Sequence, residues 1–346
     1  MRPLPEKLGE KLCVWYDAGH RELPWRQDRE PYHVWLSEIM LQQTRVEAVK
    51  GYYARFLSEL PTIEALAACP PDRLTKLWEG LGYYSRVWNL QKAAKVIMDE
   101  HGGAFPETYE AVRALPGVGD YTAGAICSIC FDLPTPAVDG NVLRVLSRVM
   151  EDGAPVTNQK TKTAYREALL PLYEAGPRGK LTQALMELGA MVCVPNGAPK
   201  CESCPLQELC LANAHGTWEK YPVKEAKKAK REEEKTVFYL TCDGCLAVRK
   251  RESKGLLAGL WELPNVEGKL AAAQALLFAE KAGCEPSELL KSVERVHVFT
   301  HIIWRMRCYY IVCKEKSPEF VWASDARRKT DVALPTAFRM FVEEEI

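Results

Sequence analysis

The chain has 346 residues, which is enough for two or three domains. Hydrophobic residues make up 47% and charged residues 27%, a globular balance that excludes wholesale disorder. The 46 basic and 46 acidic side chains cancel, which argues mildly against a strongly basic nucleic-acid-binding protein. No apolar run approaches the ~18 residues that span a bilayer, and the N-terminus has no apolar secretory core. We therefore expect a cytosolic protein whose 13 cysteines are reduced thiols or metal ligands.

Residues 1–217 are predicted to be mostly helical. Apolar residues recur there at the spacing of a helix face, and prolines and glycines separate the runs. The runs are Val34–Val49, Leu74–Leu81, Val142–Val149 and Leu181–Val192.

Beyond these helices the composition changes. Lys220–Lys235 is rich in charged residues, which is typical of a linker. The pattern that follows indicates strands, with one helix among them and a second possible helix at the end of the chain, so we expect an α+β domain. The predicted strands are Thr236–Thr241, Leu246–Arg249, Val296–Ile303 and Met306–Val312, and the helix is Leu270–Lys281.

Four cysteines lie within 18 residues, in the pattern Cys193-x7-Cys201-x2-Cys204-x5-Cys210. Four thiolates can bind either zinc or an iron–sulfur cluster. Zinc sites usually pair two short CxxC motifs. These four cysteines contain only one such motif, so their spacing favours an iron–sulfur cluster. The alternative is four unrelated buried cysteines.

Two further CxxC pairs carry weaker signals. Cys127 and Cys130 lie in an apolar helix, where we expect core packing. Cys242 and Cys245 flank Asp-Gly, which indicates a hairpin turn.

The segment Leu115–Gly119 reads Leu-Pro-Gly-Val-Gly and connects two predicted helices, Glu107–Ala114 and Asp120–Phe131. Its glycines leave the backbone uncovered, and the next helix begins with free N–H groups. Such a turn can bind a phosphate without Lys or Arg. The same turn is also a common helix connector.

Two carboxylates have contrasting surroundings. Asp139 precedes an apolar helix, where it is either a plain N-cap or a carboxylate kept ionised by the helix dipole. Glu38 has apolar neighbours on several sides, so it is either exposed or a buried acid with a raised pKa. One neutral and one charged carboxyl group can cleave a glycosidic bond, although nothing local shows that these two meet.

Taken in order, the hairpin Leu115–Gly119, the run Val138–Asn141 and the four-cysteine loop resemble the helix-hairpin-helix DNA glycosylases that carry an iron–sulfur cluster. Within that superfamily, Ser37–Val46 and Gly80–Arg86 are similar to the MutY family of adenine DNA glycosylases. The resemblance implies a mainly α-helical glycosylase followed by an α+β Nudix-like domain. The implied parts are a six-helix barrel with the hairpin (29–138), an iron–sulfur helical domain (1–28 and 139–217), a linker (218–235) and the Nudix-like domain (236–346).

The resemblance also implies an activity. Members of this family remove adenine mispaired with 8-oxoguanine or guanine from double-stranded DNA. By the same resemblance we expect a monomer that is associated with the nucleoid and binds no membrane. We also expect it to hold a [4Fe–4S] cluster on Cys193, Cys201, Cys204 and Cys210. The first gap of the cysteine loop has seven residues where the family commonly has six.

Carried over by the resemblance, Glu38 is the general acid at adenine N7, and Asp139 stabilises the oxocarbenium ion. Asn141 positions the catalytic groups. Tyr121 occupies the place of the Schiff-base lysine of related lyases, which implies an enzyme that leaves the abasic site intact.

The remaining implied roles concern the substrate. The adenine pocket corresponds to Arg21, Leu23, Trp25, Arg26, Leu41, Val46 and Gln183. Gln43 and Tyr83 correspond to residues that are inserted into the duplex. Thr44, Leu81 and Thr300 correspond to contacts with 8-oxoguanine. The hairpin that binds DNA corresponds to Gly117, Val118 and Gly119.

The C-terminal domain resembles the family's 8-oxoguanine reader through Gly255–Pro264 and Phe299–His301. A Nudix hydrolase needs a glutamate-rich helix to hold Mg²⁺, and Leu270–Leu276 has no such set. We therefore expect this domain to bind and not to hydrolyse.

Three other functions remain as alternatives. The chain could be a thymine–guanine mismatch glycosylase, an endonuclease III-like lyase, or a non-catalytic iron–sulfur DNA-binding protein. Tyr121 argues against the lyase, and the presence of both Glu38 and Asp139 argues against a silent binder.

Overall fold

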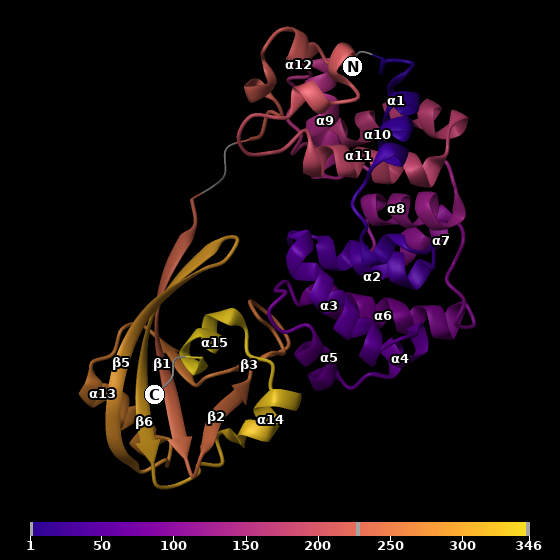
Figure 1. Cartoon of the computed structure of the whole chain (residues 1–346). Coiled ribbons are helices and arrows are strands. Elements are labelled where there is room, and N and C mark those ends of the chain that lie inside the picture. The colour runs from indigo at the N-terminus through magenta and orange to yellow at the C-terminus, as the bar shows by residue number, and fades with distance from the viewer. Residues whose placement is uncertain (1–2, 226–228, 344–346) are drawn as a thin grey trace. The chain divides into compact units, whose positions relative to one another are not determined.

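The computed structural model describes residues 3–225 and 229–343, which form two compact units. The helical unit contains Met1–Ala68 and Trp88–Ala226. The sheet unit contains Cys69–Val87 and Lys227–Ile346. Figure 1 shows helices only in the first and a twisted sheet in the second. No helix in the described part of the chain is long and apolar enough to cross a membrane.

Helices make up the first unit, and side-chain caps fix several of their starts. Thr108 accepts a hydrogen bond from the backbone of Ala111, so the helix predicted from Glu107 begins at Tyr109. The helices are α1 (Leu8–Ala18), α2 (Pro31–Leu41), α3 (Val46–Glu59), α4 (Ile63–Ala68), α6 (Ser85–Glu100), α7 (Tyr109–Ala114), α8 (Asp120–Phe131), α9 (Gly140–Met150), α10 (Gln159–Ala175), α11 (Arg178–Met191) and α12 (Leu211–Ala214). Short 3₁₀ turns lie at η1 (Pro24–Arg26), η2 (Cys201–Ser203), η3 (Gln207–Leu209) and η4 (Trp218–Lys220).

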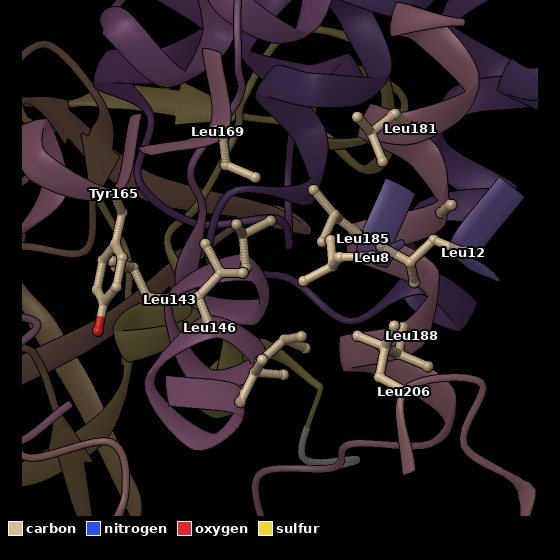
Figure 2. Packing of buried hydrophobic residues seen from close by; sticks show 14 of the residues in the cluster. Leu8, Leu12, Leu143, Leu146, Tyr165, Leu169, Leu181, Leu185, Leu188 and Leu206 are labelled. Atoms are coloured by element: carbon tan, nitrogen blue, oxygen red, sulfur yellow. The ribbon is translucent and has the colours of Figure 1, made fainter. Parts of the chain in front are cut away.

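One buried apolar cluster joins α1 to α9, α10 and α11. The apolar stripes predicted on the last two runs of residues 1–217 face this cluster (Figure 2). It contains Leu8 and Leu12 of α1, Leu143 and Leu146 of α9, Tyr165 and Leu169 of α10, and Leu181, Leu185 and Leu188 of α11. This packing fixes the N-terminus of α9 and one face of α11, from which site residues project.

A mixed sheet forms the second unit, with the strand order β3-β2-β1-β6-β5. Strands β1 and β6 are parallel, β4 pairs with β1, and β7 pairs with β2. The elements are α5 (Pro71–Leu77), β1 (Arg231–Cys242), β2 (Cys245–Lys250), β3 (Trp261–Glu262), β4 (Asn265–Glu267), α13 (Ala272–Lys281), β5 (Pro286–Val298), β6 (Ile302–Cys313), β7 (Val321–Ala323), α14 (Asp325–Thr330) and α15 (Thr336–Val342).

Two features of this sheet differ from the prediction. Residues 231–235, predicted as linker, begin β1, because Lys235 is buried with its ammonium group 4.8 Å from the Trp304 ring centroid. The predicted strand Val296–Ile303 is two strands, since the backbone amide of Phe299 donates to the carbonyl of Ile302 and closes a turn. Linker residues 226–228 lie outside the described residues.

The segment Cys69–Val87, predicted within the six-helix barrel, packs with C-terminal elements. Asp72 of α5 pairs with Lys250 at 2.7 Å. A carboxylate oxygen of Glu79 accepts the backbone amide of Leu334 at 2.7 Å. The first of these contacts is exposed and the second is half-buried, and neither is indicated by the local sequence pattern.

Candidate active site

Glu38 lies on α2, a helix that is buried on nearly all sides, and its side chain is itself buried. The hydroxyl of Tyr121 on α8 donates a hydrogen bond to Oε2 of Glu38 at 2.5 Å. The pKa of Glu38 is raised to about 7, mainly because the carboxyl is buried; the Tyr121 hydrogen bond lowers this pKa, the Asp139 charge raises it and the Arg26 charge lowers it. Of the two readings of Glu38 left open by the sequence, the buried acid is therefore correct.

Asp139 is the N-cap of α9. Its Oδ1 accepts the backbone amides of Asn141 at 2.9 Å and Val142 at 2.8 Å, and its Oδ2 accepts the Asn141 side-chain amide at 2.7 Å. Burial nevertheless raises the pKa of Asp139, because it outweighs these three donors. The amides at the helix terminus favour the ionised carboxylate, as the sequence suggests, but burial has the larger effect on the pKa.

Asn141 is held from its other side. A guanidinium nitrogen of Arg144 donates to Asn141 Oδ1 at 2.8 Å, and the same group reaches the carbonyl of Gly189 at 2.8 Å. A Cβ atom at Gly189 would lie only 2.5 Å from the Cβ of Asn141, so α11 can approach α9 here only with glycine. The approach fixes Asn141, and through it Asp139.

These carboxyl groups face one cavity of about 660 Å³ in the helical unit. The structure thus brings together most of the residues predicted from the sequence. The lining includes all four predicted catalytic residues, all seven predicted pocket residues, and two of the DNA contacts: Glu38, Tyr121, Asp139, Asn141, Arg21, Leu23, Trp25, Arg26, Leu41, Val46, Gln183, Gln43 and Thr44. A cavity of this volume, lined by both polar and apolar side chains, has room for a flipped base.

Gln183 on α11 has a defined orientation in this cavity. The hydroxyl of Tyr16 on α1 donates to Gln183 Oε1 at 2.5 Å. The amide nitrogen of Gln183 is therefore left as the donor for a ligand. Tyr16 was not found from the sequence, because no local pattern shows that α1 packs against α11.

Three predicted DNA contacts lie in the sheet unit. The hydroxyl oxygens of Tyr83 and Thr300 lie 3.1 Å apart, although the residues are 217 positions apart in the sequence. Tyr83 is exposed, whereas Leu81 is buried. Tyr83 has a φ of 47° and Gln43, in the helical unit, a φ of 57°. Non-glycine residues with such a φ are uncommon and often occur at functional sites.

The predicted hairpin joins α7 to α8. Gly117 has a φ of +78°, and a Cβ atom there would lie 2.6 Å from the Cβ of Asn89, so only glycine fits. Gly119 is the N-cap of α8 and Val118 is buried. The backbone N–H groups at the start of α8 can therefore bind a phosphate group.

Glu187 on α11 is a site residue that the sequence pattern does not indicate. It lies behind the cavity wall and accepts hydrogen bonds from Arg21 and Arg26. Burial alone would raise the pKa of Glu187, but these hydrogen bonds and charges outweigh it and lower the pKa to about 2. The only sequence signal was its position four residues after Gln183, which places both on one helix face.

The four predicted ligand cysteines line one apolar cavity. A guanidinium nitrogen of Arg148 donates to the sulfur of Cys193 at 3.3 Å. Backbone amides hydrogen-bond Cys204 and Cys210. Donors aimed at sulfur stabilise thiolate ligands, so the residues fit an iron–sulfur cluster. Within residues 3–225 and 229–343 no three His, Cys, Asp or Glu side chains converge on a single-ion position.

The other cysteine pairs behave as structural residues. Cys127 is buried in the core of α8, and Cys242 pairs with Cys245 across the β1–β2 hairpin. Asp243 and Gly244 form its turn with φ values of 46° and 70°.

Known proteins match both parts of the chain. Residues 36–171 match the HhH-GPD superfamily base excision DNA repair proteins, and residues 236–344 match the NUDIX domain. The predicted fold class, a helical helix-hairpin-helix glycosylase followed by an α+β Nudix-like domain, is thereby confirmed.

Among solved structures, a thermostable thymine-DNA glycosylase is 28% identical, with a TM-score of 0.55 over 60% of this chain and 95% of that chain. An endonuclease III–DNA covalent intermediate is 23% identical with a TM-score of 0.52, covering 60% of this chain and 94% of that one, and shows the same fold.

Relatives that match most of this chain are adenine DNA glycosylases. The adenine DNA glycosylase of Rattus norvegicus is 33% identical over 96% of this chain and 77% of its own length. That of Homo sapiens is 35% identical over 94% of this chain and 70% of its own length. That of Buchnera aphidicola subsp. Schizaphis graminum is 36% identical over 78% of each. The chain is a base-excision repair glycosylase that acts on DNA, and it belongs to the adenine DNA glycosylase family.

Proposed function

We propose that this enzyme hydrolyses the N-glycosidic bond of adenine mispaired with 8-oxoguanine or guanine. One observation carries the proposal: the Glu38 carboxyl is buried at the wall of this cavity with a pKa of about 7. A carboxyl group with this pKa is partly protonated at neutral pH and can act as a general acid. Adenine leaves readily only after its ring is protonated, so this acid meets the chemical need of the reaction.

In the proposed reaction, the Glu38 proton moves to N7 of the flipped adenine. The bond between C1′ and N9 then breaks, and its electron pair leaves with the neutral base. Asp139, in its ionised form, stabilises the positive charge that develops on the sugar. Water adds at C1′ and gives up a proton, which restores the protonated Glu38. The products are adenine and an abasic site.

Tyr121 and Asn141 position the two carboxyl groups. The Tyr121 hydroxyl fixes one oxygen of Glu38, and the Asn141 amide fixes one oxygen of Asp139. A phenol cannot form a Schiff base with the sugar, so the enzyme is a monofunctional glycosylase.

The cofactor in this proposal is a [4Fe–4S] cluster held by Cys193, Cys201, Cys204 and Cys210. When bound, the cluster supplies a covalent link between the loops that carry its ligands and a local charge near DNA. Arg148 hydrogen-bonds one ligand sulfur and the carbonyls of Val194, Trp218 and Tyr221, so it ties the loop to α9. Hydrolysis transfers no electrons, so the cluster has no part in bond cleavage.

The sheet unit reads the base opposite adenine in this proposal. Thr300 and Tyr83 carry paired hydroxyl groups, one in the turn between β5 and β6 and one exposed beside α5. Hydroxyl groups can donate to or accept from a base edge, which suits the extra N–H and carbonyl of 8-oxoguanine.

We also propose a cytosolic, nucleoid-associated monomer. None of the thirteen cysteines, all of which lie in the described residues, forms a disulfide bond, which suits a reducing compartment.

Single-turnover excision on A:8-oxoguanine, A:G and T:G duplexes tests the function. We expect adenine release from the first two and none from T:G. Thymine release would support the mismatch thymine glycosylase instead, and strand cleavage would support the lyase.

A further inference from the structure

Glu187 and the two arginines that it contacts, Arg21 and Arg26, form a polar cluster behind the cavity wall, and the proposed reaction gives Glu187 no role. Glu187 is 2% exposed and does not line the cavity, so it cannot touch the substrate. Its partners Arg21 and Arg26 do line it. A buried carboxylate that contacts two pocket cations can act on the reaction only through them.

Both oxygen atoms of Glu187 are fully used. Oε1 accepts from the Arg21 backbone amide at 3.1 Å and from Arg21 Nε at 2.8 Å. Oε2 accepts from Arg21 Nη2 at 2.8 Å and from Arg26 Nη2 at 2.9 Å. The fork with Arg21 is bidentate, which fixes direction as well as distance.

Arg26 is further restrained by groups on its other sides. Its Nη1 donates to the carbonyl of Arg21 at 3.2 Å, and its guanidinium carbon lies 5.7 Å from the ring centroid of Tyr16. The side chain is 10% exposed, so it has little room to move. Its charge acts on Glu38, where it favours the ionised carboxylate.

We propose that Glu187 is a positioning residue for base excision: it holds Arg21 and Arg26 in the cavity wall and offsets the charge of Arg26 that Glu38 experiences. The inference rests on the proposed function, in which Glu38 must be protonated to act. With Glu187 present, the two guanidinium groups contribute one net positive charge near the acid. Without it they contribute two, which favours ionised Glu38 at lower pH.

Three groups act on the Glu38 carboxyl: Tyr121 of α8 through its hydrogen bond, and Asp139 at the start of α9 and Arg26 of η1 through their charges. Arg21 and Tyr16 act on Glu187 and Arg26 from the far side. A change at Glu187 thus alters one contribution and leaves the others in place.

The test compares Glu187→Gln, Arg21→Gln and the double variant in single-turnover excision from A:8-oxoguanine across pH. We expect Glu187→Gln to slow excision by about 10- to 100-fold, the usual cost of misplacing a site group. We also expect the basic limb of its pH profile to move down by about one pH unit, at the low end of the effect of a neighbouring charge. Arg21→Gln should move the limb up, and the double variant should bring it back.

This pattern of signs separates positioning from simple support of the fold. A purely structural role predicts a lower unfolding temperature in all three variants, with an unchanged pH profile for the active fraction; that outcome overturns the proposal. Glu187→Asp, which keeps the charge on a shorter arm, should keep the wild-type limb and lose rate. A limb that moves in Glu187→Asp as far as in Glu187→Gln contradicts the charge argument.

A binding measurement covers the case in which the proposed activity itself fails. Duplexes with uncleavable 2′-fluoro-2′-deoxyadenosine opposite 8-oxoguanine report base capture without chemistry. We expect Glu187→Gln to weaken binding of this duplex relative to an undamaged one. Equal loss for both duplexes overturns the positioning role, whereas absent excision by the wild-type protein overturns only the proposed function.

Discussion

The Tyr121 hydroxyl donates to Glu38 Oε2 at 2.5 Å, across a sequence separation of 83 residues. This contact joins two helices, α2 and α8, at the cavity. It leaves the other carboxyl oxygen of Glu38 available to carry a proton. The general acid of the proposed reaction is thus fixed in place by a group that cannot itself act as a nucleophilic amine.

Replacing Glu38 with glutamine is expected to abolish excision while mismatch binding survives. The amide keeps the shape of the acid and cannot protonate adenine N7. The loss is expected to be about 10²- to 10⁴-fold, the usual contribution of general acid catalysis. Single-turnover kinetics and gel-shift affinity measure the two effects, and activity within a few-fold of wild type contradicts the role. Glu59→Gln, at the end of α3, serves as the matched control.

The pH dependence of excision should follow Glu38. Its pKa is about 7, so the protonated form dominates below pH 7 and is lost as pH rises through it. The rate of excision should therefore fall with a basic limb near pH 7. The measurement is single-turnover excision between pH 5.5 and 9. If the residual activity of Glu38→Gln shows the same basic limb, the limb belongs to the titration of another group.

Stability should show the same titration with a definite sign. The pKa of Glu38 is raised in the folded protein from 4.5 to about 7, so the folded state binds more protons between these pH values. Folding free energy is therefore lost as pH rises from 4.5 to 7, by about 3 kcal/mol in total. Glu38→Gln should be more stable than wild type at pH 8 and similar at pH 4.5. Chemical denaturation at the two pH values tests this; equal differences at both contradict it.

The sequence predicted most of the cavity, because its motifs resemble a family whose site residues are individually recognisable. It did not predict Glu187, whose partners Arg21 and Arg26 lie 166 and 161 positions away. An isolated acid in an apolar helix gives no sign of which cation it meets. Such pairings depend on how α11 packs against η1.

The predicted strand boundaries were wrong for a related reason. The charged start of β1 has the composition of a linker, and only its pairing with β6 and the Lys235–Trp304 contact make it a strand. Similarly, Asp139 has the sequence of an ordinary N-cap, and its raised pKa follows from burial by elements distant in the chain. Local pattern records backbone preference but not tertiary burial.

The four-cysteine site is expected to hold four iron atoms per chain. Purified protein should absorb in the visible range, and Cys204→Ser should lose both colour and iron. Cys127→Ala, which removes a core thiol outside the site, is the matched control and should keep both. Stoichiometric zinc without colour contradicts the cluster.

Tyr121→Lys is expected to gain abasic-site lyase activity. The new amine would stand beside the sugar, and burial would lower its pKa enough to leave part of it neutral and nucleophilic. Borohydride should then trap a protein–DNA adduct in the variant and not in the wild type. No adduct at any alkaline pH that the protein tolerates contradicts the assignment of Tyr121 to the lysine position.

The last prediction concerns Thr300, whose hydroxyl lies 3.1 Å from that of Tyr83. Thr300→Val keeps the shape of the side chain and removes the hydroxyl group. If the sheet unit reads the opposite base, this variant should lose preference for A:8-oxoguanine over A:G, at a cost of about 1–3 kcal/mol in discrimination. Excision from A:G should change little, because Glu38 and Asp139 work on the adenine strand. Thr330→Val, which alters a hydroxyl bonded within α14, is the matched control. If Thr300→Val and Tyr83→Phe both keep the full preference, the hydroxyl pair does not read the lesion, and recognition must rest on Thr44 and Leu81.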